Sequence, residues 1–330
     1  MRTDGGGGGS VGQGILAIDK QAGPTSHDVV AQLRRILGVR RVGHCGTLDP
    51  LATGLLVVCF GRYTRLADWI GAAEKEYEAT FILGADSDTG DAEGCLVQRA
   101  IERPPTESEL LAAAAEFVGT ISQVPPAHSA IKVGGVPSYR LARDQRPVAL
   151  QPRLVRIDRF AVVGYAYPRL EVEVVCGKGT YIRSLAADLG GRLGCGAYVE
   201  SLRRRRVGAI GLDDAAAVEV VGQGWNGQGC SAPYLVPPNR ALQHLEAVSL
   251  ESGVARAFAH GRAVERPGAP NAACAVYGPG AALLGIGRRG EDGARLRPLA
   301  VVDAPRGTGR ERQQWELIRL AWEAARGSGS

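Results

Sequence analysis

The stretch RRVGHCGTLDPLATGLLVVCFG, residues 40–61, joins a loop rich in reactive side chains to a short apolar run. The loop contains His44, Cys45 and Asp49, framed by glycines and a proline. The apolar run, residues 55–60, has the length and composition of a buried strand. We therefore expect a buried strand that is preceded by a loop in which one of three side chains carries chemistry.

Further strands are predicted on both sides of this stretch. Residues 14–23 form an apolar strand that ends in a turn, and residues 76–84 and 170–176 alternate polar with apolar side chains. The second of these strands places one set of residues on a common face: Tyr77, Ala79, Phe81 and Leu83. Strands that alternate predict an α/β (α+β) fold with a mixed, largely antiparallel sheet rather than a doubly wound sheet.

Helices are predicted from their ends as well as from their apolar positions. Thr25 or Ser26 is the expected cap of a helix over residues 25–38, which stops at Gly38. A capping box of Thr106 and Glu109 begins a second helix over residues 105–119. Thr180 is the expected cap of a third helix, over residues 179–194. Its apolar face contains four residues, with Arg183 beside them in the first turn: Ile182, Leu185, Ala186 and Leu189.

The second half of the chain changes character. Residues 222–233 are rich in glycine and predict a loop or linker. From about residue 246 we expect one helix and three short strands, which together make a small β-rich module. An amphipathic helix over residues 310–326 is expected to close the chain.

Composition limits the class of protein. A hydrophobic fraction of 45% and a charged fraction of 22% are typical of a soluble globular protein, and no apolar run is long enough for a membrane helix. Seven scattered cysteines, none spaced as CxxC, argue against a disulfide framework and a zinc site, and for the cytoplasm.

Charge is segregated along the chain. Residues 25–65 contain six arginines against two aspartates, and residues 132–159 contain seven bases against two acids. Between them, residues 66–131 contain twelve acids against three bases. This pattern indicates a basic face for a polyanion, with ordinary surface charge as the alternative.

Two common ligand-binding motifs are excluded by the residues at their key positions. GKGT at residues 177–180 lacks the upstream glycine of a phosphate-binding loop, because Val172 stands there. DSDTGDAEG at residues 86–94 has Asp91 where a calcium loop needs glycine and Val97 where it needs glutamate. We therefore interpret residues 86–94 as an acidic surface loop.

The reactive loop of residues 43–54 leaves Cys45 and Asp49 as candidate nucleophiles. Cys45 would need a base opposite it, and adjacent side chains such as His44 point the other way in an extended loop. Asp49 lies among apolar neighbours, and Pro50 keeps it out of the helical region. Catalysis by Asp49 is one interpretation and an Asx turn is the other. Arg183 is the candidate cation for an ionised Asp49, and Tyr77 is either a core aromatic or a platform for a base.

The segment GHCGTLDPLATG, residues 43–54, resembles the catalytic motif of the TruB-type pseudouridine synthases, with Cys45 where that family usually has Thr or Ala. Five further segments resemble motifs of the same family in the expected order, with Gln21 where proline is usual in the first: residues 14–30, 75–94, 123–143, 176–190 and 199–208. The resemblance covers about residues 14–210. The C-terminal module is a weaker match to the small PUA or PUA-like RNA-binding domain of many members.

The resemblance implies an enzyme that isomerises uridine to pseudouridine at position 55, in the T loop of tRNA, without cofactor or metal. Asp49 would be the nucleophile, Arg183 would pair with it, and Tyr77 would stack on the target base. Either C1′ of the ribose or C6 of the base is a possible point of attack. The implied substrate-binding residues are those aligned with the family's other motif positions: Lys20, His44, Lys132, Arg140, Arg143, Tyr181, Leu202 and Arg203. His44 would fill the gap left by the flipped base, and Leu202 would pack under that base.

The resemblance also implies how the chain is organised. We expect a catalytic domain over residues 14–245, which carries a T-arm-binding insertion at about residues 120–160. A flexible tail over residues 1–13 would precede it, and a PUA-like module over 246–305 and a helical tail over 306–330 would follow. The expected partner is the T stem-loop of tRNA, bound by a monomer that does not use a membrane. The alternatives are a tRNA-binding and folding protein whose catalysis is secondary, and a Cys–His hydrolase that depends on Cys45.

Overall fold

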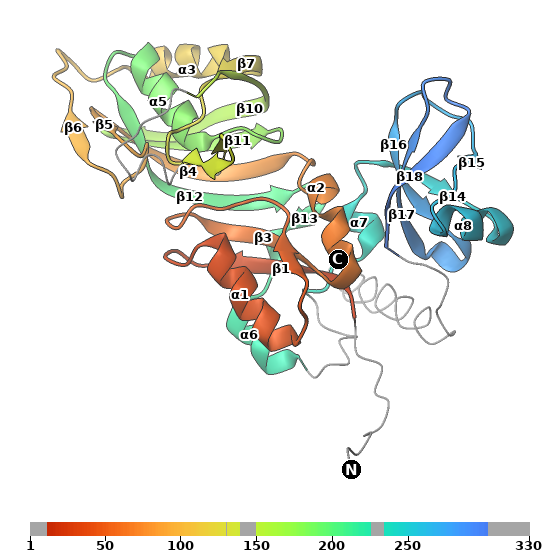
Figure 1. The fold of residues 1–330 in the computed structure, drawn as a ribbon. Helices are drawn as coiled ribbons and strands as arrows, with labels where there is room; N and C mark the ends of the chain where they lie inside the picture. The colour runs from red at the N-terminus through yellow and green to blue at the C-terminus, as the bar shows by residue number, and fades with distance from the viewer. Residues whose placement is uncertain (1–11, 130, 139–149, 226–233, 303–330) are drawn as a thin grey trace, which may run out of the picture. The chain divides into compact units, whose positions relative to one another are not determined.

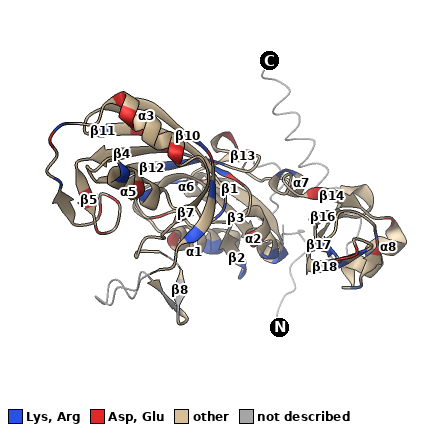
Figure 2. Cartoon of the chain, turned by 90° about the horizontal axis from the view of Figure 1, so that it is seen from above, with Lys and Arg blue, Asp and Glu red and all other residues tan. Residues whose placement is uncertain are grey.

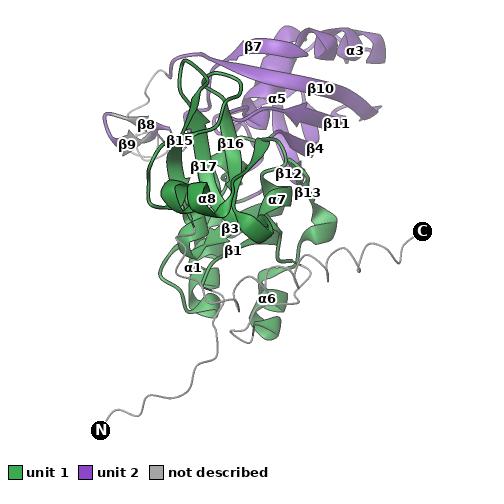
Figure 3. Cartoon of the chain, turned by 90° about the vertical axis from the view of Figure 1, so that its right-hand side faces the viewer, with its two compact units in different colours: residues 1–50, 54–73, 206–330 green, residues 51–53, 74–205 purple. Residues whose placement is uncertain are grey.

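The computed structural model describes residues 12–129, 131–138, 150–225 and 234–302 of the 330-residue chain (Figure 1). The chain forms two compact units (Figure 3). Unit 1 contains residues 1–50, 54–73 and 206–330, and unit 2 contains residues 51–53 and 74–205. Both units are therefore built from separated parts of the sequence.

Unit 1 begins with β1 (Gly14–Lys20), which pairs antiparallel with β3 (Thr53–Phe60) from Gly14↔Phe60 to Lys20↔Gly54. Helix α1 (Ser26–Leu37) and β2 (Val42–His44) lie between them in the sequence, and β2 also pairs with β3. The remaining elements of this part are short: η1 (Gly61–Leu66), α2 (Ala67–Ile70), β13 (Ile210–Gly211), η2 (Leu212–Asp214), α6 (Val218–Gly224) and α7 (Pro238–Ala241).

The C-terminal part of unit 1 is a five-stranded sheet with the order β14-β16-β17-β18-β15. Its first pair, β14 and β16, is parallel, and the others are antiparallel. Helix α8 (Ser252–Ala259) packs on one face, and η3 (Pro279–Ala281) joins β16 to β17. The strands are short: β14 (Glu246–Ser249), β15 (Val264–Glu265), β16 (Ala273–Tyr277), β17 (Leu283–Arg289) and β18 (Arg295–Val301).

Unit 2 is built on strands in the order β12-β4-β11-β10-β7. β4 pairs antiparallel with β11, β11 with β10, and β10 with β7. The bounds of these strands are β4 (Lys75–Leu83), β7 (Gly119–Gln123), β10 (Arg153–Ala166), β11 (Arg169–Cys176) and β12 (Ala197–Val207), whose last two residues belong to unit 1.

Two helices and two small hairpins complete the described part of unit 2. The helices are α3 (Glu107–Glu116) and α5 (Ile182–Arg192). One hairpin joins β5 (Ala85–Ser87) to β6 (Leu96–Gln98), and the other joins β8 (Lys132–Val133) to β9 (Val136–Pro137). The mixed, largely antiparallel α/β fold expected from the sequence is confirmed.

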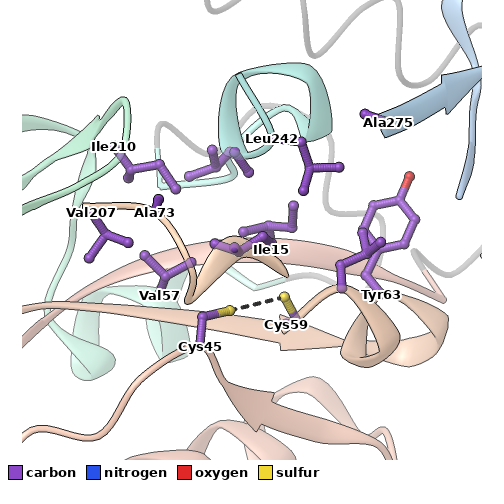
Figure 4. Close-up of a cluster of buried hydrophobic side chains, with 14 of the residues drawn as sticks. Ile15, Cys45, Val57, Cys59, Tyr63, Ala73, Val207, Ile210, Leu242 and Ala275 are labelled. Carbon is purple, nitrogen blue, oxygen red and sulfur yellow. Dashed lines mark hydrogen bonds between the residues drawn. The ribbon is translucent and has the colours of Figure 1, made fainter. Parts of the chain in front are cut away.

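The core of unit 1 explains why its distant segments fold together. Figure 4 shows a cluster in which Ile15, Cys45, Val57 and Cys59 pack with residues as far along the chain as Ala275. All of these side chains are at most 6% exposed. Burial of this apolar surface is the main stabilising contribution, at about 25 cal/mol per Å².

Local signals account for two of the helices. Thr25 caps α1 and Gly38 ends it in the left-handed conformation, with φ of 67°. Thr106 and Glu109 form the predicted capping box of α3. The prediction that Thr180 caps the third helix is wrong, because α5 begins one residue later, with Tyr181 at the cap position. The hydroxyl of Thr180 donates instead to the carbonyl of Gly177.

Three predicted segments fall partly or wholly outside the described residues. The predicted linker of residues 222–233 begins inside α6, so the loop prediction is wrong for residues 222–224, and residues 226–233 are not described. The N-terminal tail up to residue 11 and the C-terminal helix of residues 310–326 also lie outside the described residues.

Candidate active site

The loop that contains Asp49 is anchored by hydrogen bonds to main-chain groups on both sides of that residue. The hydroxyl of Ser26, in the first turn of α1, accepts from Leu48 N at 2.8 Å and donates to Leu48 O at 2.9 Å. The amide of Gly23 donates to Pro50 O at 2.9 Å. Ser26 is buried and Asp49 is half-buried. The backbone of the loop is therefore fixed before any substrate binds.

Lys20 adds a buried cation to the same loop. Its side chain lies at the end of β1 and is 1% exposed. Nζ donates to the carbonyls of Gln21, Asp49 and Pro50, each at 3.1 Å. These contacts satisfy the three donors of an ammonium group, which is the condition for burying one. Lys20 therefore holds the main chain of Asp49 in place.

Cys45 and His44 lie in different surroundings although they are adjacent. Cys45 is 6% exposed, and its Sγ lies 3.4 Å from Sγ of Cys59 in the core of unit 1 (Figure 4). The hydrogen bond with Cys45 and burial raise the pKa of the Cys59 thiol well above its usual value. His44 is half-buried at the end of β2, with its ring centroid 6.2 Å from that of His27. Cys45 is thus a core residue, which disfavours the hydrolase hypothesis.

Arg183 is buried in the first turn of α5 and has a fixed set of partners in unit 2. It is 5% exposed, and Nη1 donates to Thr89 O at 2.6 Å while Nη2 donates to His128 O at 2.8 Å. Nη1 also lies 3.4 Å from Oδ2 of Asp91. The guanidinium is therefore oriented by two carbonyls and one carboxylate of its own unit.

Asp91 shows that residues 86–94 are more than an acidic surface loop. Its side chain is 6% exposed, and Oδ1 accepts from Thr89 Oγ1 at 2.6 Å and from Glu93 N at 3.1 Å. Gly90 has a φ of 75°, and a Cβ there would lie 3.2 Å from Cβ of Arg183. Glycine lets the loop pass directly over Arg183. The surface-loop prediction is wrong for Asp91, because a buried arginine needs a counter-charge.

The first turn of α5 is capped from another strand. Gln123, at the end of β7, accepts from Tyr181 N at 2.8 Å through Oε1 and donates to Tyr181 O at 3.1 Å through Nε2. Gln123 is 1% exposed. Ser184 donates to Val124 O at 2.7 Å. These contacts join β7 to the turn that carries Arg183, so they fix the position of that side chain as well.

The other site residues predicted in unit 2 lie on its sheet or at the start of α5. Tyr77 is buried on β4, opposite Val174 of β11, and Leu202 is buried on β12. Tyr181 is half-buried at the start of α5. Arg203 is half-buried, and Nη1 donates to Thr53 Oγ1 at 3.3 Å.

The predicted site residues are divided between the units. Lys20, His44 and Asp49 belong to unit 1, whereas Tyr77 and Arg183 belong to unit 2 with Tyr181, Leu202 and Arg203. The pairing of Arg183 with Asp49 and the stacking of Tyr77 on a base stay predictions.

The basic segments differ in how much charge they expose. Arginines 34, 35, 40 and 41, around the end of α1, are all exposed. A further basic run, RRRR, covers residues 203–206 of β12. Arg204 is 2% exposed and Arg205 lies 3.3 Å from Glu78, so not all four arginines are available to a polyanion. Figure 2 shows acidic residues along α3, which carries Glu107, Glu109 and Glu116. Lys132 belongs to β8, and Arg140 and Arg143 lie outside the described residues.

Two further observations concern the described part of the chain. None of its helices is long and apolar enough to cross a membrane. Within the same residues, no three His, Cys, Asp or Glu side chains are grouped so that they could hold a metal ion.

Sequence reasoning missed Ser26, Asp91 and Gln123. Each acts on a residue far from it in sequence, through a side chain that also has an ordinary local interpretation as a cap, a loop acid or a strand residue. No local sequence signal distinguishes them, since residues 86–94 also have the composition of an acidic surface loop.

Comparison with protein-family models gives three consecutive matches. Residues 34–182 match the TruB family pseudouridylate synthase N-terminal domain, and residues 183–223 match the tRNA pseudouridylate synthase B C-terminal domain. Residues 247–302 match the C-terminal domain of pseudouridine synthase II TruB.

Individual proteins agree with these matches. The tRNA pseudouridine synthase B of Mycobacterium sp. strain KMS is 41% identical over 307 residues, which cover 90% of this chain and 98% of that protein. The protein of the same name from Syntrophobacter fumaroxidans is 45% identical over 240 residues, or 73% of this chain and 78% of the relative. The fold is similar to that in a crystal structure of a Cbf5–Nop10–Gar1 complex, with a TM-score of 0.70 and 24% identity over 92% of this chain and 86% of the other.

Proposed function

Because this chain belongs to the TruB family of pseudouridylate synthases, we propose that it isomerises uridine to pseudouridine in tRNA, at position 55 of the T loop. The observation that carries the proposal is the anchored loop of unit 1, in which Ser26 and Lys20 hold the main chain on either side of Asp49. A nucleophile must be held in position before the substrate arrives, because the entropy of positioning is otherwise part of the barrier.

The reaction breaks a glycosidic C–N bond and replaces it with a C–C bond to the same ribose. The target base must leave the stack, and a carboxylate of Asp49 attacks either C1′ of the ribose or C6 of the base. The uracil then turns and forms the C1′–C5 bond, the covalent bond to Asp49 breaks and restores the carboxylate, and C5 loses its proton while N1 gains one. A site for this step needs walls that hold a flat ring without fixing its rotation. Tyr77 and Leu202 have the side chains for such walls, and His44 would fill the gap in the loop.

Arg183 would serve as the cation for Asp49. An arginine suits this role because it stays protonated and can bind both carboxylate oxygens. Its contacts with Thr89, His128 and Asp91 support the proposal, since they orient the guanidinium from within unit 2. Asp91 would then be a positioning residue that acts through Arg183.

The substrate contacts are proposed from the basic residues of the family motifs. Exposed arginines around the end of α1 and half-buried Arg203 would bind phosphates of the T arm, together with Lys132, Arg140 and Arg143. Tyr181 would line the site at the start of α5. We further propose that the enzyme acts in the cytoplasm as a monomer, without cofactor or metal.

The proposal is tested on an unmodified tRNA transcript. The purified chain should form pseudouridine at the T-loop position, and the Asp49→Asn variant should bind the transcript equally well but form it slower by roughly 10⁴-fold or more. Formation of pseudouridine at another position would refute the site, and a rate for the variant within about tenfold of the unaltered chain would refute the nucleophile. A variant that fails to modify tRNA in cells, yet still supports tRNA folding and growth, would favour the folding-protein alternative.

A further inference from the structure

The first turn of α1 places a second imidazole beside His44. His27 lies on that turn and is exposed, whereas His44 is half-buried at the end of β2. Their ring centroids are 6.2 Å apart and the ring planes meet at 74°, so the edge of one ring faces the other. Aromatic pairs favour this arrangement, with centroids about 4.5–7 Å apart. The two imidazoles are therefore neighbours in the fold although they come from different elements.

The position of His27 is fixed by the residues around it. Thr25 and Asp28 form the capping box of α1, with hydrogen bonds of 2.7 to 3.1 Å. The hydroxyl of Ser26 bonds to the main chain of Leu48. The side chain of His27 takes no part in either set of bonds, so a substitution there leaves the start of α1 intact.

Helix α1 is bonded to the main chain on both sides of His44. Before His44, Nη2 of Arg34 donates to Val42 O at 3.5 Å, and after it Ser26 holds Leu48. Figure 2 shows α1 beside β2. The helix and the strand therefore form one frame, in which His27 keeps a constant position beside His44.

The main chain of His44 is fixed, but its side chain has two rotatable bonds. His44 pairs with Val58 of β3, and Cys45 N donates to Val57 O at 2.8 Å. Under the proposed function, the imidazole of His44 must occupy one place in the RNA when the target base leaves the stack. A side chain that is ordered beforehand loses less conformational entropy at that step. A neighbouring ring supplies this order.

We propose that His27 is a positioning residue for His44. The contact between the rings holds the His44 imidazole in the orientation that fills the space left by the flipped uridine. This inference rests on the proposed function and adds to it a residue that acts through His44. His27 contributes through the shape of its ring and not through a charge. The competing role for an exposed histidine, binding of an RNA phosphate, gives a different experimental result.

The test measures kcat/KM on a full-length tRNA transcript. His27→Ala should lower kcat/KM roughly 2- to 10-fold, the range expected from one aromatic pair. His27→Phe keeps a flat ring and should stay within about twofold of the unaltered chain. Gln32→Ala, at an exposed position of the same helix, is the matched control and should change nothing. The slope of log kcat/KM against log salt should be the same in all three variants, because no phosphate contact is lost.

A double-mutant cycle determines whether His27 acts through His44. His44→Ala alone should lower kcat/KM, and the addition of His27→Ala should then cause no further loss. Additive losses would overturn the proposal, because His27 would then act independently of His44. An unchanged kcat/KM in His27→Ala or in His44→Ala would overturn it as well.

The remaining outcomes separate the positioning role from other roles. Equal losses in His27→Ala and His27→Phe would contradict a role for the ring shape. A salt slope that is shallower by about 1 in His27→Ala would assign His27 to phosphate binding instead. An equal loss in Gln32→Ala would assign the effect to α1 as a whole. If the unaltered chain did not modify the transcript, the proposed function itself would fail.

Discussion

Lys20 and Asp91 are charged residues that contact other residues of the predicted site. Lys20 binds three main-chain carbonyls around Asp49, and Asp91 binds Arg183. Both residues therefore hold groups of the predicted site in position through contacts within the protein.

Replacing Lys20 with Met should destabilise unit 1 and displace the loop. The change removes three hydrogen bonds from a buried charged donor, so we expect a loss of about 2–4 kcal/mol in the free energy of unfolding. kcat should fall with it, since the main chain of Asp49 loses its anchor. Chemical denaturation and single-turnover kinetics measure the two effects. Lys178→Met is the control, because that side chain is exposed, and an unchanged kcat in Lys20→Met would contradict the anchoring role.

Replacing Asp91 with Asn should lower kcat and leave KM for tRNA unchanged. The amide keeps the shape but removes the charge that orients Arg183, and a small displacement in a catalytic group can cost about 10²-fold in rate. Steady-state kinetics on a tRNA transcript measure this, with the exposed neighbour Glu93→Gln as the matched control. A rise in KM at constant kcat would place Asp91 in RNA binding instead.

Candidate site residues can be selected from the sequence where the motif is contiguous. Asp49 was singled out because its apolar neighbours and Pro50 make an unexplained carboxylate conspicuous. Arg183 was a weaker candidate. Its one local signal is that a positive side chain gains no stabilisation from the helix dipole at the N-terminal end of a helix. Asp91 was missed because its partner is far along the chain, and nothing local marks a carboxylate that will be buried.

At the scale of elements, helix ends were predictable when their caps are local. α1 and α3 have their caps within three residues, and both were placed correctly. α5 has its cap on β7, so the sequence near Thr180 could not reveal it. The same limit explains the loop prediction that overlapped α6, because glycines there suggested a turn before packing was known.

Replacing Gln123 with Ala should loosen the start of α5. It removes two hydrogen bonds to Tyr181, which should cost about 1–2 kcal/mol in the free energy of unfolding. kcat should fall too, because Arg183 lies in the released turn. Thr180→Ala should change both much less, since that hydroxyl does not cap the helix. Equal effects of the two substitutions, measured by denaturation and kinetics, would contradict this assignment.

The pair of Glu246 on β14 and Arg289 on β17 should make the C-terminal sheet sensitive to acid. The hydrogen bond from Arg289 lowers the pKa of Glu246 below its ordinary value of 4.5. A lowered pKa stabilises the folded state above the unfolded pKa, and the contribution disappears as pH falls through the folded pKa.

Glu246→Gln should therefore lower Tm most near neutral pH. The difference from the unaltered chain should shrink as pH drops below about 4, and solvent screening keeps it modest because Glu246 is half exposed. Thermal unfolding between about pH 7 and 3 measures this. Glu265→Gln serves as the control, and a difference that grows on acidification would have the wrong sign.

At the scale of the whole molecule, the fold class was predictable and the division into units was not. Alternating strands and short helices indicate the mixed sheet, and each pattern is local. The units, however, exchange segments: residues 51–53 belong to unit 2 although the loop before them belongs to unit 1. The predicted site residues are therefore divided between both units. Which segments belong to which unit is determined by long-range packing, which the local sequence does not reveal.

The charge pattern was informative at the same scale. The basic segment of residues 25–65 contributes exposed arginines around α1. In the run RRRR, residues 203–206, which lies outside both basic segments, Arg204 is buried and Arg205 pairs with Glu78. Arg288 and Arg297 of the C-terminal sheet lie outside both basic segments. Strand pairing, and not sequence spacing, brings Arg288 opposite Arg297.

We propose that Asp49, whose loop is held by Lys20 and Ser26, is the nucleophile. The most direct measurement is the single-turnover rate of pseudouridine formation in a tRNA transcript by Asp49→Asn, beside Asp68→Asn, an exposed carboxylate of the same unit. We predict that Asp49→Asn binds the transcript normally and is slower by roughly 10⁴-fold or more, while Asp68→Asn retains the full rate. A rate for Asp49→Asn within about tenfold of that of the unaltered chain would contradict the assignment of Asp49 as the nucleophile.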